Sequence, residues 1–416
     1  MRKSVHPSRI AGTVSAPPSK SAMLRAVAAG VLSGSTVRIA NPSLCEDARA
    51  ALGAARSLGA DVMWTGDQVA VRGGAYPREA EIDCGESGLS LRLFAPIAAL
   101  FDGRTTLTGR GTLLRRPVGP IERPLAELGA SGTTREGFLP VAVRGPLEGG
   151  RAIVDASGGS QFLTGLLMAL PKAKADSILT VPRLSSVPYI QMTLTLLREF
   201  GVAVEHDDFR EFRIAGRQTY HRDAYRVEGD WSGAAFLLVA GALAGRVRVL
   251  GLDPESPQGD KRILDVLRTA GADVAVGPGA VEVAAAPLRP FRFDATDCPD
   301  LVPPLVALAA GAAGVSIIRG AGRLDHKESR RAEALAEVFG ALGVAVERDG
   351  DNLRIQGGPI RSGAVNSHDD HRIAMAAAAA ALSAEGVVVI EGAESAAKSY
   401  PGFFEDLKSL GGRVDE

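Results

Sequence analysis

Cysteine is scarce in this sequence. Its 416 residues include three cysteines, Cys45, Cys84 and Cys298, and no Cys-x-x-Cys motif. None of them lies at metal-binding spacing from the six histidines. Because disulfide-dependent secreted domains and zinc domains both need clustered cysteines, the scarcity predicts a reduced, cytoplasmic protein with no bound metal.

A surplus of positive charge is also missing. Lysine and arginine total 47 against 48 aspartates and glutamates, so the formal net charge is −1. General binders of nucleic acid or of membrane surfaces normally carry a large basic excess. The balance argues against both partners, and any site for an anionic ligand must be local.

Long uninterrupted apolar runs are absent too. The most apolar stretches, such as AMAAAAAALSAEGVVVI, are rich in alanine and broken by Gly and Glu, as expected of a buried helix followed by a strand. The first 20 residues, MRKSVHPSRIAGTVSAPPSK, lack the apolar segment of a signal peptide. Both features predict a cytoplasmic protein with no membrane partner.

What the sequence does contain is one plan repeated six times. Each copy has a polar turn, a helix of small apolar residues and a β-branched strand, and then a second helix with leucines on one face. Successive copies start about 70 residues apart, which suits a compact βαβ-type unit. The copies begin at Ser19, Glu86, Gly158, Gly229, Asp297 and Asp369.

These repeats predict the fold class and the domains. The first helix of each copy is apolar on nearly all sides and is therefore buried, and three such helices fit inside a domain walled by sheets. We expect an α/β protein with two three-repeat domains, residues 14–227 and residues 1–13 plus 228–416. The strand RIAGTVSAP is expected to pair with the C-terminal half.

Cations lie at the starts of the buried helices, where the helix dipole is already positive. Capping of the helix end accounts for Ser19, Asp230 and Asp369. It does not account for Lys20, Arg25, Arg92 and Arg372. If the helices are parallel, each domain presents three positive N-termini on one face, so the added cations indicate an anionic ligand.

The choice of cation is also informative. Only eight of the 47 basic residues are lysines, and lysine can donate a proton where arginine cannot. Lys20, Lys327 and Lys398 lie in polar turns, where a compact charge of this kind is useful. Ser21 and Arg25, four residues apart, share a helix face and can hold one phosphate or carboxylate between them.

Several stretches, taken together and in order, resemble the signature segments of the 5-enolpyruvylshikimate-3-phosphate synthase family. They are PPSKSAMLRA, RRPVG, SQFLTGLLMALP, VPYIQMT, EGDWSGAAF, DCPDLVP, HKESRRAEAL, DDHRIAMA and AKSYPGFFEDL. The resemblance implies two inverse α/β-barrel-like domains, each of three βαβαββ units, with the active site in the cleft between them. It also implies transfer of the enolpyruvyl group of phosphoenolpyruvate to the 5-hydroxyl of shikimate-3-phosphate, without a cofactor, by a monomer.

The resemblance further implies residue roles. Shikimate-3-phosphate would be held by Ser21, Arg25, Ser160, Gln161, Ser186, Asp300 and Lys327, with Tyr189 nearby. Phosphoenolpyruvate would contact Lys20, Gly88, Arg116, Gln161, Arg331, Arg372 and Lys398. Asp300 would be the base for the attacking hydroxyl, and either Glu328 or Lys20 would protonate the methylene carbon. Phosphate then leaves a tetrahedral adduct.

Some positions depart from the common bacterial pattern. The turn GESGLSLR, residues 85–92, has Glu86 and Leu89 where Asn and Thr are usual. Glu86 places a negative charge next to the expected phosphoenolpyruvate site, so we expect it to affect affinity for that substrate and sensitivity to the inhibitor glyphosate. Gly159 replaces a serine, and Val187 and Arg330 replace Lys and Asp.

Three alternatives stay open at this point. A sister transferase that acts on UDP-N-acetylglucosamine shares the fold, but it carries a reactive cysteine in the loop before Arg-Pro-Val, and GRGTLLRRPV has none. A six-unit ring around nucleic acid would need a basic inner surface. A relative that has lost catalysis would differ only in activity.

Overall fold

The computed structural model describes residues 1–416, which form two compact domains. The N-terminal domain spans Lys20–Val227, and the C-terminal domain combines Met1–Ser19 with Glu228–Glu416. The first crossing point lies at residues 19 and 20, six residues later than expected from the sequence. The reason is that strand β2 (Ile10–Ser15) pairs in parallel with β15 (Gly245–Leu250) along its whole length.

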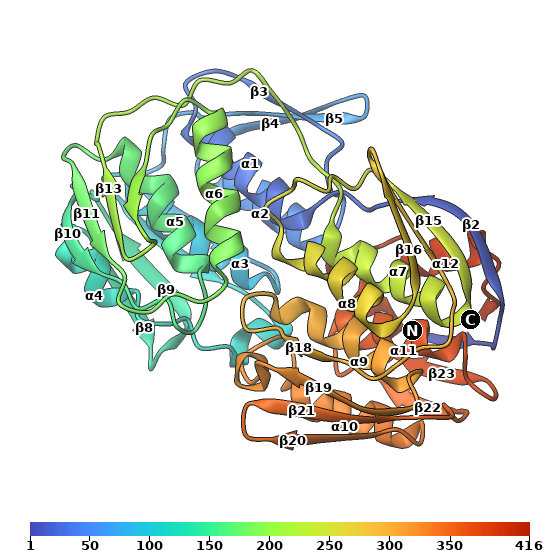
Figure 1. Ribbon diagram of the computed structural model, residues 1–416. Coiled ribbons are helices and arrows are strands. Elements are labelled where there is room, and N and C mark those ends of the chain that lie inside the picture. Colours follow the sequence, from blue (N-terminus) through green and yellow to red (C-terminus); the bar gives the residue numbers. More distant parts are fainter. The chain divides into compact units, whose positions relative to one another are not determined.

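Each domain is built from three repeats, and each repeat forms its own four-stranded sheet (Figure 1). The N-terminal domain contains α1 (Lys20–Leu32), β3 (Val37–Ala40), α2 (Glu46–Ser57), β4 (Asp61–Thr65), β5 (Gln68–Arg72), β6 (Glu79–Asp83), α3 (Gly88–Ala98), β7 (Arg104–Thr108), η1 (Gly111–Arg115), α4 (Glu122–Glu127), β8 (Ser131–Arg135), β9 (Phe138–Arg144), β10 (Gly150–Ile153), α5 (Gln161–Ala169), η2 (Leu170–Lys172), β11 (Ser177–Thr180), α6 (Val187–Glu199), β12 (Glu205–Asp207), β13 (Glu211–Ile214) and β14 (Ala224–Arg226).

The C-terminal domain contains β1 (Arg2–Val5), β2, α7 (Trp231–Ala244), β15, η3 (Gly259–Arg262), α8 (Ile263–Ala270), β16 (Asp273–Gly277), β17 (Ala280–Ala284), β18 (Arg292–Asp294), η4 (Pro299–Leu301), α9 (Val302–Ala310), β19 (Gly314–Arg319), η5 (Ala321–Leu324), α10 (Arg331–Ala341), β20 (Ala345–Asp349), β21 (Asn352–Gly357), β22 (Gly363–Asn366), α11 (His371–Ala381), β23 (Val388–Glu391), η6 (Ala393–Lys398), α12 (Phe403–Ser409) and β24 (Val414–Asp415).

All six sheets share one topology. In the sheet β6-β7-β9-β8, the first two strands are parallel and the remaining pairs are antiparallel, and the other five sheets repeat this order. Three repeats borrow a strand from elsewhere in the chain. Strand β14 completes the first repeat, β2 the fourth and β1 the sixth. The predicted pairing of RIAGTVSAP with the C-terminal half is confirmed.

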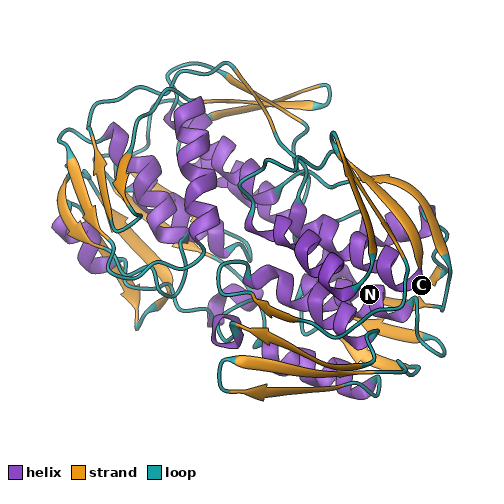
Figure 2. Ribbon diagram, in the orientation of Figure 1, coloured by secondary structure: helices purple, strands orange, loops and turns teal.

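The first helix of each repeat lies inside its domain, and the strands lie outside it (Figure 2). These helices are α1, α3 and α5 in one domain and α7, α9 and α11 in the other. In α7, twelve of 14 residues are buried, and all 11 residues of α11 are buried. Each domain therefore has one core, formed where three apolar helices pack against each other and the inner faces of three sheets.

The second helix of each repeat ends at a glycine with positive φ. At Gly271, for example, φ is +92° and the backbone N–H bonds to carbonyls of the last helical turn, as in an ordinary C-terminal cap. The other five are Gly59, Gly129, Gly201, Gly343 and Gly411. Side chains other than glycine rarely adopt this conformation, so these glycines fix where each amphipathic helix stops.

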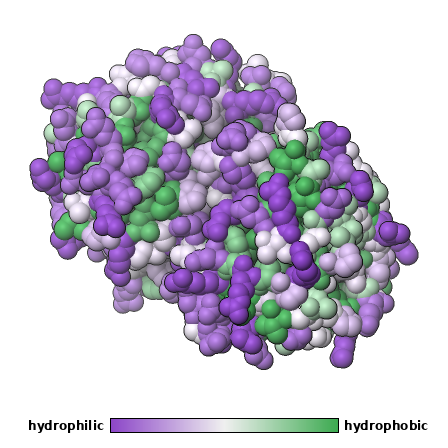
Figure 3. All heavy atoms as spheres, in the orientation of Figure 1, coloured by the Kyte–Doolittle hydropathy of each residue, from purple (hydrophilic) through white to green (hydrophobic).

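The outer surface is mixed in character. Figure 3 shows polar residues over most of the visible face of each domain, with smaller apolar areas between them. No helix is both long and apolar enough to span a membrane.

Candidate active site

In the N-terminal domain, Arg25 joins the starts of three helices. Its guanidinium donates to the Ser21 carbonyl of α1 (2.9 Å), to the Thr164 hydroxyl of α5 (3.4 Å), and to the Thr193 hydroxyl (3.0 Å) and Tyr189 carbonyl (3.1 Å) of α6. The side chain is almost fully buried. Arg25 therefore supports the floor of a potential site formed by these helix ends.

A ring of polar groups lies one helical turn above this floor. The floor contains Arg25 and its partners Thr164 and Thr193. Four positions before them, which is one turn or about 5.4 Å along a helix, stand Ser21, Ser160 and Tyr189. Ser160 is at the N-cap position of α5. Ser186, at the N-cap position of α6, has a φ of +63°, a left-handed conformation that costs a residue other than glycine free energy. Such strain is typical of functional sites.

Lys20 is the first residue of α1 and has a carboxylate partner. Its Nζ lies 2.9 Å from Asp47 Oδ2, in the first turn of α2. Both side chains are mostly buried, with exposed fractions of 14% and 10%. The pair fixes the Lys20 ammonium at the helix end, where sequence reasoning had placed a cation but no partner.

Next to this ring, Gly88 and Arg116 are in close contact. A Cβ added to Gly88 would lie 2.9 Å from the Arg116 guanidinium and 2.8 Å from Arg92 Nη1. Arg116 is buried to 7% exposure. The lack of a side chain at residue 88 thus makes the space that the Arg116 guanidinium occupies at the start of α3.

Arg92 differs from the sequence-based hypothesis of a ligand-facing cation. Its guanidinium donates to the backbone carbonyls of Gly88, Pro117 and Val118 and to Oε1 of Gln161 at 3.1 Å. These bonds connect α3, the segment after η1 and the start of α5. Arg92 therefore orients Gln161.

In the C-terminal domain, the Asp300 carboxylate binds three cationic side chains. Its carboxylate accepts from Lys327 Nζ at 3.3 Å, Arg331 Nη1 at 2.9 Å and Arg372 Nη2 at 3.1 Å. Asp300 lies in the short helix η4 before α9, and Arg372 lies in the first turn of α11. The arrangement brings the starts of α9 and α11 to the same end of the domain, as expected for parallel helices.

Arg331 is the centre of a carboxylate cluster. Besides Asp300, it donates to Glu328 Oε2 (2.6 Å) and, through Nε and Nη2, to both oxygens of Asp370 (2.9 and 3.2 Å). Its side chain has no exposed surface. One guanidinium therefore fixes the expected base, Asp300, and the expected acid, Glu328. A direct contact between Arg331 and phosphoenolpyruvate stays a prediction.

Two lysines border this cluster. Burial lowers the pKa of Lys327 to about 8, and Asp300 only partly offsets the effect. Lys398 is buried at the end of η6, and its Nζ donates to the Asp369 carbonyl at 2.6 Å. The sequence predicted Asp369 as the cap of α11, and this prediction is wrong. Asp370 takes that role by accepting from the Arg372 N–H, because Asp369 has a φ of +55°.

A family model described as EPSP synthase (3-phosphoshikimate 1-carboxyvinyltransferase) matches residues 5–407. The chain belongs to the EPSP synthase family.

The similarity covers the whole chain. Proteins named 3-phosphoshikimate 1-carboxyvinyltransferase from Methanocella arvoryzae and Aeropyrum pernix are each 42% identical to it, over 97% and 99% of this chain and 97% and 96% of theirs. The structure of an EPSP synthase from Acinetobacter baumannii matches 100% of both chains at 25% identity, with a TM-score of 0.84. The two-domain α/β fold expected from the resemblance is therefore the fold of the family.

Three carboxylates beside these residues were given no site role from the sequence: Asp47, Asp260 and Asp370. Asp260, in η3, is fully buried and accepts from the Ser232 hydroxyl at the start of α7. Burial, and then the nearby Asp300, raise its pKa to about 6. The only sequence signal was position: Asp47 lies 27 residues after Lys20 and Asp260 lies 28 residues after Ser232, and Asp370 itself stands at a helix start. A carboxylate there is also an ordinary helix-end residue.

Glu86, which departs from the common family pattern, has a specific partner. Its carboxylate does not extend into open space but accepts from both the backbone N–H (2.8 Å) and the hydroxyl (2.7 Å) of Thr112 in η1. Leu89, the second departure in this turn, is buried in α3.

Proposed function

We propose that this chain transfers the enolpyruvyl group of phosphoenolpyruvate to the 5-hydroxyl of shikimate-3-phosphate and releases phosphate. The observation that supports this most is the pair of carboxylates Asp300 and Glu328 on one buried guanidinium, Arg331. Acid–base work on two different atoms needs two such groups at a fixed separation. We further propose that the enzyme is a cytoplasmic monomer that needs no metal or organic cofactor.

The N-terminal ring suits a sugar phosphate. Hydroxyls, amide groups and helix N-termini bind phosphate and ring hydroxyls well. We assign shikimate-3-phosphate to Ser21, Arg25, Ser160, Gln161 and Ser186, with Asp300 and Lys327 from the C-terminal domain. Arg25 acts mainly through the helices that it joins, because its guanidinium bonds to groups of α1, α5 and α6.

Phosphoenolpyruvate needs several cations, because it carries both a carboxylate and a phosphate. We assign it to Lys20, Gly88, Arg116, Gln161, Arg331, Arg372 and Lys398. Since these residues come from both domains, the reaction requires contributions from each. Charge-assisted hydrogen bonds to the phosphate strengthen as it becomes the leaving group, and this stabilises the transition state.

The chemistry is addition followed by elimination. Asp300 accepts the proton of the 5-hydroxyl as its oxygen bonds to the enol carbon, while Glu328 protonates the methylene carbon to a methyl group. Loss of a proton from that methyl group then expels phosphate and restores the double bond. Lys20 is the alternative proton donor, and its ion pair with Asp47 holds the ammonium at the helix end.

The sister reaction on UDP-N-acetylglucosamine is disfavoured by the cysteines. Cys45 and Cys84 are both fully buried, and burial raises the pKa of each thiol, to about 11 for Cys45. A reactive cysteine needs the opposite environment, with access and a lowered pKa. No thiol in the N-terminal domain has the properties that this chemistry requires.

The proposal is tested by giving the purified protein phosphoenolpyruvate with one acceptor at a time and measuring released phosphate. Shikimate-3-phosphate should support release, whereas UDP-N-acetylglucosamine and buffer should not. Release with the nucleotide sugar alone would assign the chain to the sister reaction. No phosphate release with either acceptor would indicate a relative without catalysis.

Gly88→Ala should raise KM for phosphoenolpyruvate roughly 10-fold or more, because the added methyl group must displace the Arg116 or Arg92 guanidinium. KM for shikimate-3-phosphate should change much less. Steady-state kinetics with each substrate varied in turn measures both. The matched control is Gly53→Ala within α2, where an added Cβ meets no atom within 4 Å. Equal KM changes for both substrates would contradict the placement of Arg116.

Arg25→Ala should weaken shikimate-3-phosphate binding roughly 10- to 100-fold, because the helix ends lose the group that joins them. Phosphoenolpyruvate binding should weaken far less. Titration of each substrate by calorimetry compares the two losses. Thr193→Val, which removes one partner of Arg25, should shift the same affinity in the same direction by a smaller factor. Equal weakening of both substrates by Arg25→Ala would refute the assignment.

A further inference from the structure

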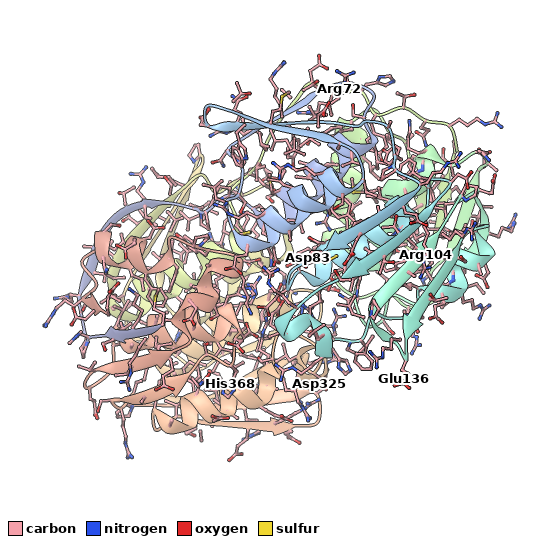
Figure 4. All side chains as sticks on the ribbon, turned by 180° about the vertical axis from the view of Figure 1, so that it is seen from behind. Arg72, Asp83, Arg104, Glu136, Asp325 and His368 are labelled. Atoms are coloured by element: carbon pink, nitrogen blue, oxygen red, sulfur yellow. The ribbon has the colours of Figure 1, made fainter.

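The segment that carries Arg116 is held to the start of α3 by a series of short contacts. Residues 83–88 lie along residues 110–116: the Arg110 N–H donates to the Gly85 carbonyl at 2.8 Å, and the Arg110 guanidinium donates to Asp83 at 2.9 Å. Figure 4 labels Asp83 at the end of β6, where this series begins. The Gly88–Arg116 contact closes it at the other end.

Glu86 is the charged link in the middle. One oxygen of its carboxylate accepts both the N–H and the hydroxyl of Thr112, and Thr112 is 2% exposed. The fit is close, because a Cβ on the neighbouring Gly111 would lie 2.4 Å from the Glu86 carboxyl carbon. Gly111 also has a φ of +55°, which glycine adopts readily. Glycine at residue 111 thus leaves the space that the Glu86 carboxylate occupies.

This contact bears on Arg116 because η1 is a single short turn. Thr112 is its second residue, and the Arg116 N–H closes the turn by donating to the Leu113 carbonyl at 3.2 Å. Fixing Thr112 therefore fixes the start of the turn that ends at Arg116. Since a carboxylate that accepts two hydrogen bonds forms a strong link, its loss should release the whole turn.

We propose that Glu86 is a positioning residue for phosphoenolpyruvate: by binding Thr112 it fixes η1 and so holds the Arg116 guanidinium over Gly88. This inference rests on the proposed function for its kinetic effect, although the contact itself does not. It also reverses the expectation from sequence, in which the charge of Glu86 opposes an anionic substrate. The carboxylate is instead engaged by η1, and its effect on affinity is favourable.

The two views predict opposite kinetics. If Glu86 positions Arg116, Glu86→Ala should raise KM for phosphoenolpyruvate about 10-fold, with kcat and KM for shikimate-3-phosphate little changed. Glu86→Gln, whose side-chain amide can still bond to both groups of Thr112, should stay near the wild type. If the charge itself matters, both variants should lower KM for phosphoenolpyruvate alike, and the proposal is overturned.

The chain provides a matched control. Glu122 makes the same contact elsewhere in the domain, since its Oε1 accepts from the N–H and the hydroxyl of Thr134 at 2.8 and 2.6 Å. Glu122 begins α4, six residues after Arg116, and Glu122→Ala removes an equivalent pair of bonds that joins α4 to β8 instead of holding η1. It should leave KM for phosphoenolpyruvate unchanged. A rise equal to that of Glu86→Ala would show that the effect is not specific to η1.

A second readout does not depend on activity. Trypsin can cut η1 after Arg110 and after Arg115, whereas the bond after Arg116 precedes Pro117 and is resistant. If Glu86 holds the turn closed, Glu86→Ala should be cut at these two bonds roughly 10-fold faster than the wild type, Glu86→Gln and Glu122→Ala. Fragment masses identify the bonds. Cleavage at the wild-type rate would overturn the proposal.

The two readouts separate this inference from the proposed function. A wild-type protein that releases no phosphate with shikimate-3-phosphate would refute the function, and the cleavage rates would still decide whether Glu86 holds η1. Faster cleavage of Glu86→Ala in an active enzyme whose KM for phosphoenolpyruvate is unchanged would show that η1 does not position Arg116, and this also overturns the proposal.

Discussion

Asp300→Asn should lower kcat by about 100- to 10,000-fold, the usual loss when a general base is removed. Asparagine keeps the shape of the side chain and one oxygen acceptor, but it cannot take up the proton of the attacking hydroxyl. The three cations that bind the carboxylate also lose one negative partner. Steady-state phosphate release at saturating concentrations of both substrates measures the effect.

The control for this variant lies three residues earlier in the same turn. Asp297→Asn changes the charge of DCPD by the same amount and should leave kcat within a few-fold of the wild type. Circular dichroism and thermal unfolding confirm that both variants fold. If Asp300→Asn kept near-normal turnover, Asp300 would have no role as the base.

Asp370→Ala should produce the largest loss of stability. Its carboxylate and the Arg331 guanidinium are both completely buried, and Asp370 also accepts from Ser329 and caps α11. Burial alone would raise its pKa, but Arg331 outweighs burial and holds the pKa below the usual range. Removing one partner of a buried ion pair costs about 3–5 kcal/mol when the other charge is left unpaired. Arg331 keeps Asp300 and Glu328 as partners, so we expect the lower end, about 3 kcal/mol, which lowers Tm by roughly 6–12 °C in a domain of this size.

Two comparisons isolate the ion pair. Asp370→Asn keeps a good N-cap but loses the charge, so it should lie between the wild type and Asp370→Ala. Asp230→Ala removes the equivalent cap of α7, where Asp230 accepts from the Gly233 N–H, and should cost only about 1 kcal/mol. Urea unfolding measures all three free energies. Equal losses for Asp370→Ala and Asp230→Ala would mean that the ion pair contributes nothing beyond the cap.

The fold was predictable because its signals are local. Six helices that are apolar on every side, each about 70 residues from the next, can only be buried, and the glycines that end the amphipathic helices are visible as single letters. Borrowed strands were harder to place. RIAGTVSAP could be assigned to the C-terminal half, but the exact crossing point depends on how far β2 pairs with β15.

The site was predictable in composition but not in geometry. Cations at helix starts could be counted, yet the sequence does not show which atoms each one faces. Arg92 and Arg331 both looked like ligand contacts, and the structure directs the first to backbone carbonyls and the second to three carboxylates. The partner of Arg331, Asp370, lies 39 residues further along the chain.

The sequence likewise does not show which atoms the Glu86 carboxylate faces, which is why its predicted effect differs from the one that the structure supports. From sequence it is an added negative charge beside an anion site, whereas its partner, Thr112, lies 26 residues away in a turn with no marked pattern of its own. Contacts of this kind join neighbouring elements of one repeat. They become visible only once the strands between them are paired.

Transfer of an enolpyruvyl group by addition and elimination should leave an isotopic label in the product. The wild-type protein is incubated with phosphoenolpyruvate and shikimate-3-phosphate in D₂O, and the products are identified by NMR. We expect free phosphate and an enolpyruvyl ether whose methylene group carries deuterium, because that carbon passes through a methyl group. An ether without deuterium, or phosphate release with no ether, would contradict it.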